Sequence, residues 1–413
     1  MLDHRPLFLF IESNTSGTGV IFVQKAYELG LTPVLVASDP RKYDYADAPS
    51  LRLETCDTYN ASALEQLAVR LSSHNVIAGV FSSSEYFIAQ AAALARTLGL
   101  CCPDADRIMA CRDKSVQRQT VSARGIDDLG FALVSTSEEA GEWAAQRQGP
   151  TVVKPTRGSG STGVKLCIGE AEARNQASVL FDAMPETPIL IEDFAPGLEY
   201  SVELFDGKVC GLVSKHLGKT PYFVECGHDF PARVEQSEAE SLGQFAEECA
   251  EALGITWGPA HVELRSDGQK IHLVEVNPRL AGGLIPIIIQ AASGLDLIGA
   301  TIQKACGGAF KISKPRADSV ALRFIVPEQN GYLVDVTGFE EARAIPGVIS
   351  AKLDRSLPLF FETSHDFHDR IGHLIAVNPD QQAVIVSIEQ AMGCIALTFA
   401  DDSSIFNGQG VLR

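Results

Sequence analysis

The chain has 413 residues, 46% hydrophobic and 21% charged, a composition typical of a soluble globular protein of two or three domains. Its formal net charge of −18 argues against nucleic acid or a membrane surface as a partner, and its longest apolar run, near 280–289, is too short to span a bilayer. The 10 cysteines include no CxxC pair, which indicates reduced thiols and a cytoplasmic location.

The first part of the chain predicts a doubly wound α/β domain with a parallel sheet. Strands are expected at 7–11, 32–37 and 76–81, with helices between them, one of them capped by Asn60. The first strand soon meets Glu12, so we do not interpret it as a signal peptide. The Gly17-x-Gly19 loop lacks the third glycine of a dinucleotide fingerprint and is interpreted as a tight turn. Ligands of such domains bind at strand ends, here near 13–18 and 82–85.

Two lysines and a glycine-rich loop follow. Lys114 lies on an expected basic helix, and Lys154 ends an apolar strand at 151–155. The loop at 157–163, RGSGSTG, then leads into a returning strand. Glycines let a backbone approach phosphate closely, and amides and serine hydroxyls can donate to its oxygens. Since no helix follows at once, this is not a Walker-type loop, and a mobile hairpin loop stays as the alternative.

The middle of the chain alternates strands with polar segments. The strand at 189–194 ends in acids, and a hairpin turns at Asp206-Gly207. We interpret the segment 215–231, which contains Glu225 and His228, as a loop. An amphipathic helix is predicted at 237–253, closed by Gly254.

The stretch 261–279, HVELRSDGQKIHLVEVNPR, predicts two strands that carry unusual polar residues. Glu263 lies in one strand, and Glu275, Asn277 and Arg279 follow at alternate positions in the next. Alternate residues share a face of a strand, and burying such groups is costly unless something pairs them. A hard divalent cation with a polyphosphate would satisfy them together, whereas an exposed hairpin with edge charges is the alternative.

The turn of this hairpin decides whether the two glutamates can share a metal. A two-residue Asp267-Gly268 loop would place Glu263 and Glu275 on opposite faces. An odd-length loop, or a bulge at Gly268, would place them on one face. We therefore predict the longer or bulged turn.

After Arg279, Gly282 and Gly283 lead into one expected helix from about 284 to 305. Beyond 308 the pattern predicts a mixed α+β domain of strands and turns. Arg370 in this part is open to a structural role or a role in lining a cleft.

The motifs, in their order and spacing, resemble the ATP-grasp superfamily over about 111–304. The resemblance rests on the spacing of Lys114 and Lys154, the RGSGSTG loop, IEDF with Glu199, and the pattern E-(11)-E-x-N-P-R. It implies an α/β and α+β protein with an N-terminal doubly wound domain at 1–110 and a two-lobed ATP-grasp domain at 111–308. The small lobe would span about 111–195 and the large lobe would begin at about 196, completed by a C-terminal α+β domain at 309–413.

The resemblance also implies roles for residues and cofactors. ATP would bind with Mg²⁺, or Mn²⁺ as an alternative, between the two lobes. The residues implied for ATP are Lys114, Lys154, Gly158, Ser159, Gly160, Ser161, Glu192, Asp193, Phe194 and Glu199. Those implied for the metal are Glu263, Glu275 and Asn277, and those for catalysis are Arg279, Asn277 and Lys154. Those implied for the substrate are Glu225, His228, Arg279, Gly282 and Gly283.

The continuation of the last motif favours one branch of the family. Biotin carboxylases resemble the chain in layout but usually continue the NPR motif with a glutamine-valine-glutamate-histidine run, whereas this chain reads NPRLAGG. Together with PYFVECGHDFP, this resembles L-amino acid ligases of the dapdiamide-synthetase type. The implied reaction activates a small carboxylate as an acyl phosphate and joins it to an amine, both small molecules. A carboxylase of the biotin or purine-pathway type, a non-catalytic nucleotide-binding protein, and a homodimer stay open.

Overall fold

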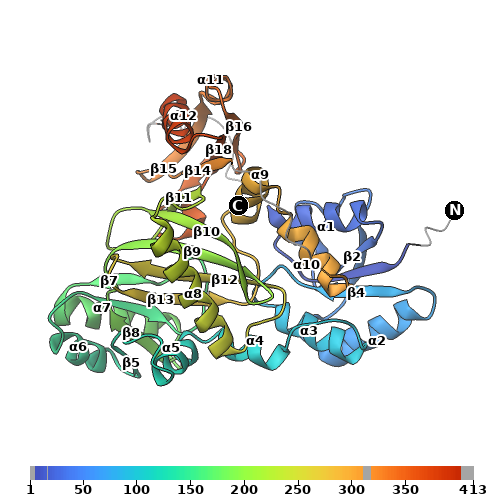
Figure 1. Ribbon diagram of the computed structural model, residues 1–413, viewed down its shortest axis with the longest axis horizontal. Coiled ribbons are helices and arrows are strands. Elements are labelled where there is room, and N and C mark those ends of the chain that lie inside the picture. The colour runs from blue at the N-terminus through green and yellow to red at the C-terminus, as the bar shows by residue number, and fades with distance from the viewer. Residues whose placement is uncertain (1–4, 16, 310–317, 401–413) are drawn as a thin grey trace. The chain divides into compact units, whose positions relative to one another are not determined.

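The computed structural model of the chain describes residues 5–15, 17–309 and 318–400 (Figure 1). The chain forms two compact units, each assembled from three segments. The first contains Met1–Asp128, Tyr200–Leu212 and Val234–Pro315, and the second contains Leu129–Glu199, Val213–Arg233 and Arg316–Arg413. The three domains expected from the sequence, with boundaries after 110 and 308, stay a prediction.

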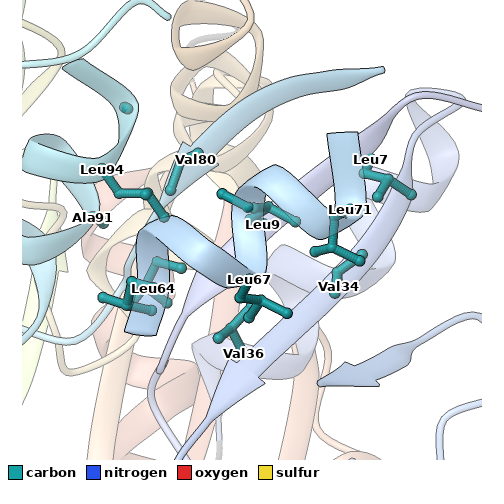
Figure 2. Packing of buried hydrophobic residues seen from close by; sticks show 13 residues of the cluster. Leu7, Leu9, Val34, Val36, Leu64, Leu67, Leu71, Val80, Ala91 and Leu94 are labelled. Carbon is teal, nitrogen blue, oxygen red and sulfur yellow. The ribbon is translucent and has the colours of Figure 1, made fainter. Parts of the chain in front are cut away.

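The first unit begins with the predicted parallel sheet. Its strands, in the spatial order β3-β2-β1-β4, are β3 (Arg52–Thr55), β2 (Thr32–Ala37), β1 (Leu7–Ile11) and β4 (Ile77–Phe81). Helices α2 (Ala61–Ser72) and α3 (Ile88–Thr97) pack on one face, where Leu7 and Leu9 meet Leu64 and Leu67 (Figure 2). The Asn60 side chain accepts a hydrogen bond from the Ala63 amide, which confirms the expected cap. The doubly wound N-terminal fold is therefore confirmed.

The other face of this sheet is covered by helices that are far apart in sequence. α1 (Thr18–Glu28) and α10 (Leu297–Ala305) contact each other, and α10 also contacts β4. The prediction of a single helix from about 284 to 305 is wrong. The segment breaks at Gly294, which has a φ of +75°, into α9 (Ile285–Ser293) and α10, bent by 106°. In the described ranges no single helix is long and apolar enough to cross a membrane, and only this bent pair meets the length and composition criteria jointly.

The rest of the first unit is an antiparallel group of strands with helices packed on it. Its strand order is β13-β12-β9-β10, where β9 (Leu198–Phe205) and β10 (Lys208–Leu217) each continue into the second unit. The hairpin β12 (Pro259–Ser266) and β13 (Ile271–Asn277) packs against α8 (Gln236–Leu253), and α5 (Lys114–Ala123) contacts β13. α4 (Ala105–Cys111) precedes α5. Gly254 ends α8 in the left-handed conformation, as predicted.

The second unit contains a four-stranded antiparallel sheet in the order β5-β8-β6-β7. Its strands are β5 (Phe131–Val134), β8 (Ile189–Asp193), β6 (Thr151–Pro155) and β7 (Lys165–Cys167). α6 (Ser137–Ala145) and α7 (Gly169–Ala183) cover it, with Ala140, Ala173 and Leu180 among the buried contacts. The two predicted strands that flank the glycine-rich loop are thus β6 and β7.

The C-terminal part of the second unit is α+β, as predicted. Antiparallel strands β11 (Glu225–Phe230), β14 (Ser319–Ile325), β18 (Gly372–Asn378) and β16 (Val348–Leu353) pair in this order. β15 (Gly331–Thr337), β17 (Leu359–Phe361) and β19 (Ala396–Phe399) form a small sheet, and the helices are α11 (Phe339–Arg343) and α12 (Gln381–Cys394). The loop expected at 215–231 is wrong over 215–217, which is the end of strand β10, and over 225–230, which is strand β11. Its buried charges hide the strand pattern, because each has an ion-pair partner in this unit.

Candidate active site

The first half of the candidate site is the β12–β13 hairpin, where Glu263 pairs directly with Glu275. Cross-strand partners lie on the same face of a sheet, which confirms the predicted arrangement of these carboxylates. The turn is also longer than two residues, since Ser266 pairs with Ile271.

The irregularity that aligns the two glutamates lies elsewhere than expected. The turn at 267–270 has an even length, which alone would pair Glu263 with Val274 and turn Glu275 away. Instead, Val274 is an extra residue between Leu273, which pairs with Leu264, and Glu275. The bulge is therefore at Val274, not at Gly268, and it re-aims Glu275.

Glu275 is held between a cation and an amide. Lys114 Nζ lies 2.8 Å from Glu275 Oε2, and the Asn277 side-chain amide donates to Glu275 Oε1 at 2.8 Å. Burial acts to lower the pKa of Lys114, but Glu275, Glu85 and Glu263 outweigh burial and raise the pKa above its ordinary value. The lysine therefore stays charged beside these carboxylates.

Glu263 is held by a buried histidine. His261 Nε2 lies 2.8 Å from Glu263 Oε1, and its Nδ1 lies 2.6 Å from Glu203 Oε1. Burial acts to lower the pKa of His261, but Glu203 and Glu263 outweigh it and raise the pKa to about 10. The imidazole is thus a cation at neutral pH.

Arg279 brings a carboxylate from the N-terminal sheet into the same set. Arg279 Nη2 lies 2.8 Å from Glu85 Oε2. Glu85 follows β4, at the strand-end position where the sequence predicted ligand binding, but it was not among the predicted site residues. In the sequence, the sign of a functional role for Glu85 is its position after a buried strand, which is also typical of a turn that caps a helix. The structure adds Glu85 to the candidate site because Glu85 forms an ion pair with Arg279.

Arg279 lines a small pocket in the first unit. Its lining includes Arg279 and the polar side chains of Asn14, Thr18 and Ser83. The predicted glycines follow in sequence, and a Cβ built at Gly282 would meet no atom within 4 Å. The space beside Gly282 is therefore open.

The charges of this set leave an excess of acid. Four carboxylates, Glu85, Glu203, Glu263 and Glu275, face three cations, Lys114, Arg279 and protonated His261. Two of these acids are directly opposed across the hairpin, which is unfavourable without a cation. Carboxylate and amide oxygens are the ligands that a hard divalent cation prefers. The donor set of Glu263, Glu275 and Asn277 therefore fits such an ion.

A buried network holds the backbone of β13 in place. The Gln117 side chain accepts a hydrogen bond from the Val276 amide and donates one to the Val276 carbonyl. Val276 lies between Glu275 and Asn277. Beside the bulge, Asp127 accepts from the Leu273 amide, and Arg118 donates to the Leu273 carbonyl and to Asp127. These contacts fix the strand on both sides of Glu275.

The second unit carries the other predicted nucleotide residues. Lys154 Nζ lies 2.5 Å from Glu192 Oε1, and both side chains are buried on neighbouring strands β6 and β8. The amides of Asp193 and Phe194 donate to the carbonyls of Gly130 and Pro150. These two amides therefore form hydrogen bonds within the second unit.

The glycine-rich loop runs between β6 and β7 and needs its glycines. Gly158, Gly160 and Gly163 have φ angles of +143°, +65° and +75°. Ser161 also has a positive φ, of 66°, and its hydroxyl donates to the Phe223 carbonyl at 3.0 Å. The loop is thus shaped by its own sequence and by a neighbouring segment.

The predicted residues Glu199 and Glu225 meet at one buried lysine. Lys215 Nζ lies 2.8 Å from Glu199 Oε1 and 2.7 Å from Glu225 Oε1. Arg370, which the sequence left open, lies 2.5 Å from Glu225 Oε2, so it is part of this cluster. Burial acts to raise the pKa of Glu225, but Lys215 and Arg370 outweigh it and hold the pKa well below its usual range.

His228 lies beside Glu225 in the cluster around Lys215. Its Nε2 is 3.7 Å from Glu225 Oε2, and its ring meets Phe324 edge-on. The side chain is fully buried. Its position suits orienting Glu225 better than exchanging a proton with a substrate.

Replacing Lys215 by methionine should destabilise the protein. The substitution keeps the side-chain length but removes the cation that the buried carboxylates of Glu199 and Glu225 share, and we expect the free energy of unfolding in urea to fall by about 3 kcal/mol. Lys208→Met is the control, since Lys208 is 73% exposed in its pair with Glu247 and should change stability by no more than about 0.5 kcal/mol. Equal effects of the two substitutions would refute a stabilising role for the buried pairs.

This contribution also has a defined pH dependence. The folded-state pKa of Glu225 is depressed, so the stabilisation is present above the ordinary carboxyl pKa and is lost as the pH falls through the lower, folded-state value. The difference between the wild type and Lys215→Met should therefore shrink in acid.

Comparisons with known proteins identify the families to which two parts of the chain are similar. Residues 147–287 match the model of an ATP-grasp domain, and residues 323–400 match L-amino acid ligase C-terminal domain 2. The chain is 33% identical over 393 residues to an uncharacterized protein of Sinorhizobium fredii, covering 94% of this chain and 82% of that protein. It is 25% identical over 214 residues to dapdiamide A synthase of Enterobacter agglomerans, covering 47% of this chain and 48% of that protein.

A solved structure shares the whole fold. The L-amino acid ligase from Bacillus licheniformis superposes with a TM-score of 0.82 at 19% identity, covering 96% of this chain and 100% of that one. This similarity shows the fold and confirms the expected architecture.

Proposed function

The chain belongs to the ATP-grasp superfamily and carries the C-terminal domain of L-amino acid ligases, and from this premise we propose that it joins two amino acids, or an amino acid and a small acid, at the cost of ATP. ATP-dependent ligation of a carboxylate to an amine fits the relatives of this chain. The observation that carries the proposal is the pair Glu263 and Glu275 on one face of a hairpin, followed by Arg279.

The reaction would proceed in two balanced steps. A carboxylate oxygen of the first substrate attacks the γ-phosphorus of ATP, the bond to the β-phosphate oxygen breaks, and an acyl phosphate and ADP result. The amine nitrogen of the second substrate then attacks the acyl carbon. Phosphate leaves with the bonding electrons, and the amine loses a proton, which gives the amide.

Residues of the first unit would neutralise the charge that opposes the first step. Glu263, Glu275 and Asn277 would hold Mg²⁺, which when bound supplies positive charge against the phosphates. Lys114 would contact the phosphates, and Arg279 would align the attacking carboxylate and stabilise the acyl phosphate. Lys154, Glu192 and Glu199, with the backbone of Asp193 and Phe194, would also contact ATP.

The pair of Arg279 and Glu85 supports an amino acid as substrate. A guanidinium that lines a pocket and a carboxylate 2.8 Å from it complement the carboxylate and the ammonium of a zwitterion. Glu225, predicted from the sequence to hold the ammonium, is already paired with Lys215 and Arg370. Glu225 forms ion pairs with two cations, whereas Glu85 forms its ion pair with Arg279, so we assign the ammonium to Glu85. Glu225 and His228 are then assigned a structural role in the cluster around Lys215.

A screen for products tests the proposal. ADP release would be measured with ATP and Mg²⁺ against pairs of amino acids and small di- or tricarboxylates, with mass spectrometry of the products. We expect ADP release to depend on both substrates and to match the amide formed. Turnover that requires bicarbonate would favour a carboxylase, and ATP binding without substrate-stimulated ADP release would favour a non-catalytic nucleotide-binding protein.

A further inference from the structure

The glycine-rich loop contacts a turn of the C-terminal domain. Gly160 lies against the ring of Phe367 so closely that a Cβ built on the glycine would be 2.2 Å from Phe367 Cδ1. The Phe367 amide donates to the Gly160 carbonyl at 3.3 Å. Two residues on, the Thr162 hydroxyl donates to Asp366 Oδ2 at 3.1 Å. All of these residues lie in the second unit.

The turn that makes these contacts is itself well braced. Asp369 is 2% exposed and accepts from the amides of Ser364 and His365. Asp366 is 5% exposed and accepts from the Ser364 hydroxyl at 2.8 Å. His365, with a φ of +61°, stacks on Tyr222 with ring centroids 3.7 Å apart and planes 6° apart. A turn fixed in this way can determine the position of a loop that rests on it.

We propose that the turn 364–369 is the platform on which the glycine-rich loop docks, and that Phe367 and Asp366 are positioning residues for ATP. The inference rests on the proposed role of the loop at the phosphates. It gives the C-terminal domain, matched at 323–400 to that of L-amino acid ligases, a role in nucleotide binding. A side chain at position 160 would collide with the Phe367 ring, in addition to the strain of the positive φ there.

Phe367→Ala tests the contact without relying on ATP. Arg157 begins the loop and is exposed, so the rate at which trypsin cleaves the full-length chain after Arg157 reports how often the loop leaves its platform. We expect about fivefold faster cleavage than in the wild type without nucleotide. Phe367 is 42% exposed, so its truncation should leave the fold intact. Phe360→Ala is the matched control, since Phe360 is 57% exposed and packs on Tyr332 instead.

The same variant tests the role in nucleotide binding. If docking helps ATP bind equally in the ground state and in the transition state, its loss in Phe367→Ala should raise the KM for ATP by a similar factor of about five. The kcat should stay nearly unchanged. Thr162→Val should act in the same direction because it loses the hydroxyl, and Thr162→Ser should restore wild-type values. The effects of Gly160→Ala and Phe367→Ala on the cleavage rate and on the KM for ATP should not add when the two substitutions are combined. The effects of Gly160→Ala and Phe360→Ala should add.

The outcomes separate this inference from the proposed function. Unchanged cleavage in Phe367→Ala would overturn the docking contact, and faster cleavage with an unchanged KM for ATP would overturn the positioning role. Were the wild type to show no ATP-dependent turnover, the proposed function would fail, and with it the positioning role, whereas the cleavage assay would still decide whether the loop docks.

Discussion

Glu275→Gln should reduce Mg²⁺-dependent turnover by about 1000-fold while the protein stays folded. The substitution removes one of the two opposed charges proposed to hold the metal, and charge stabilisation by a metal contributes several kcal/mol to such reactions. Glutamine still offers an oxygen to Lys114 and Asn277, which both contact Glu275, so the melting temperature should change little. Substrate-dependent ADP release, measured across a titration of Mg²⁺, checks the expectation.

The control for this prediction is Glu248→Gln on the exposed face of α8, where the carboxylate accepts a hydrogen bond from Gln244. It should leave both turnover and the Mg²⁺ dependence unchanged. Retained activity in Glu275→Gln, with a wild-type response to Mg²⁺, would sink the metal assignment.

Arg279→Lys should lower kcat by about 100- to 1000-fold. Lysine keeps the positive charge but loses the planar fork that can hold Glu85 and a substrate carboxylate at the same time. Loss of one well-placed donor to a developing charge has an effect of this size in other enzymes. The KM for ATP should change less than kcat, because other residues are assigned to the nucleotide.

Steady-state kinetics with each substrate varied in turn measures this split. Arg70→Lys is the matched control, since Arg70 is 62% exposed in its pair with Glu54 and should behave as the wild type. A higher KM for the carboxylate substrate with an unchanged kcat would contradict a transition-state role for Arg279 and would leave it a role in substrate binding only.

Local sequence patterns predicted the regular parts of the fold well. Strands β1, β2 and β6 begin and end at the predicted residues, because each is a short buried apolar run bounded by turn residues. Helix α8 was predicted to within one residue from its amphipathic pattern and Gly254. The shared face of Glu263 and Glu275 was predicted because two carboxylates can bind one metal ion only from the same side of the hairpin.

The features that the sequence did not reveal depend on contacts between distant residues. The bulge at Val274 has no local signature, since it is fixed by Asp127, Arg118 and Gln117 from another part of the chain. Strand β11 was missed because charged residues fit a buried strand only when they have ion-pair partners. Partners such as Arg370 are distant in sequence and cannot be identified from the local pattern. Glu85 entered the candidate site through its ion pair with Arg279, 194 residues away in sequence.

Helix α10 has a consequence for how the N-terminal sheet can form during synthesis. Residues 297–305 cover one face of a sheet whose strands all lie before residue 82, and a Cβ built at Gly79 on β4 would lie 3.2 Å from the Ala305 carbonyl. A ribosome that has made only the first 110 residues has therefore produced the sheet without the helix that covers part of its apolar surface. A fragment ending there should aggregate when expressed alone, and a fusion that borrows this domain would need to carry residues 297–305 with it.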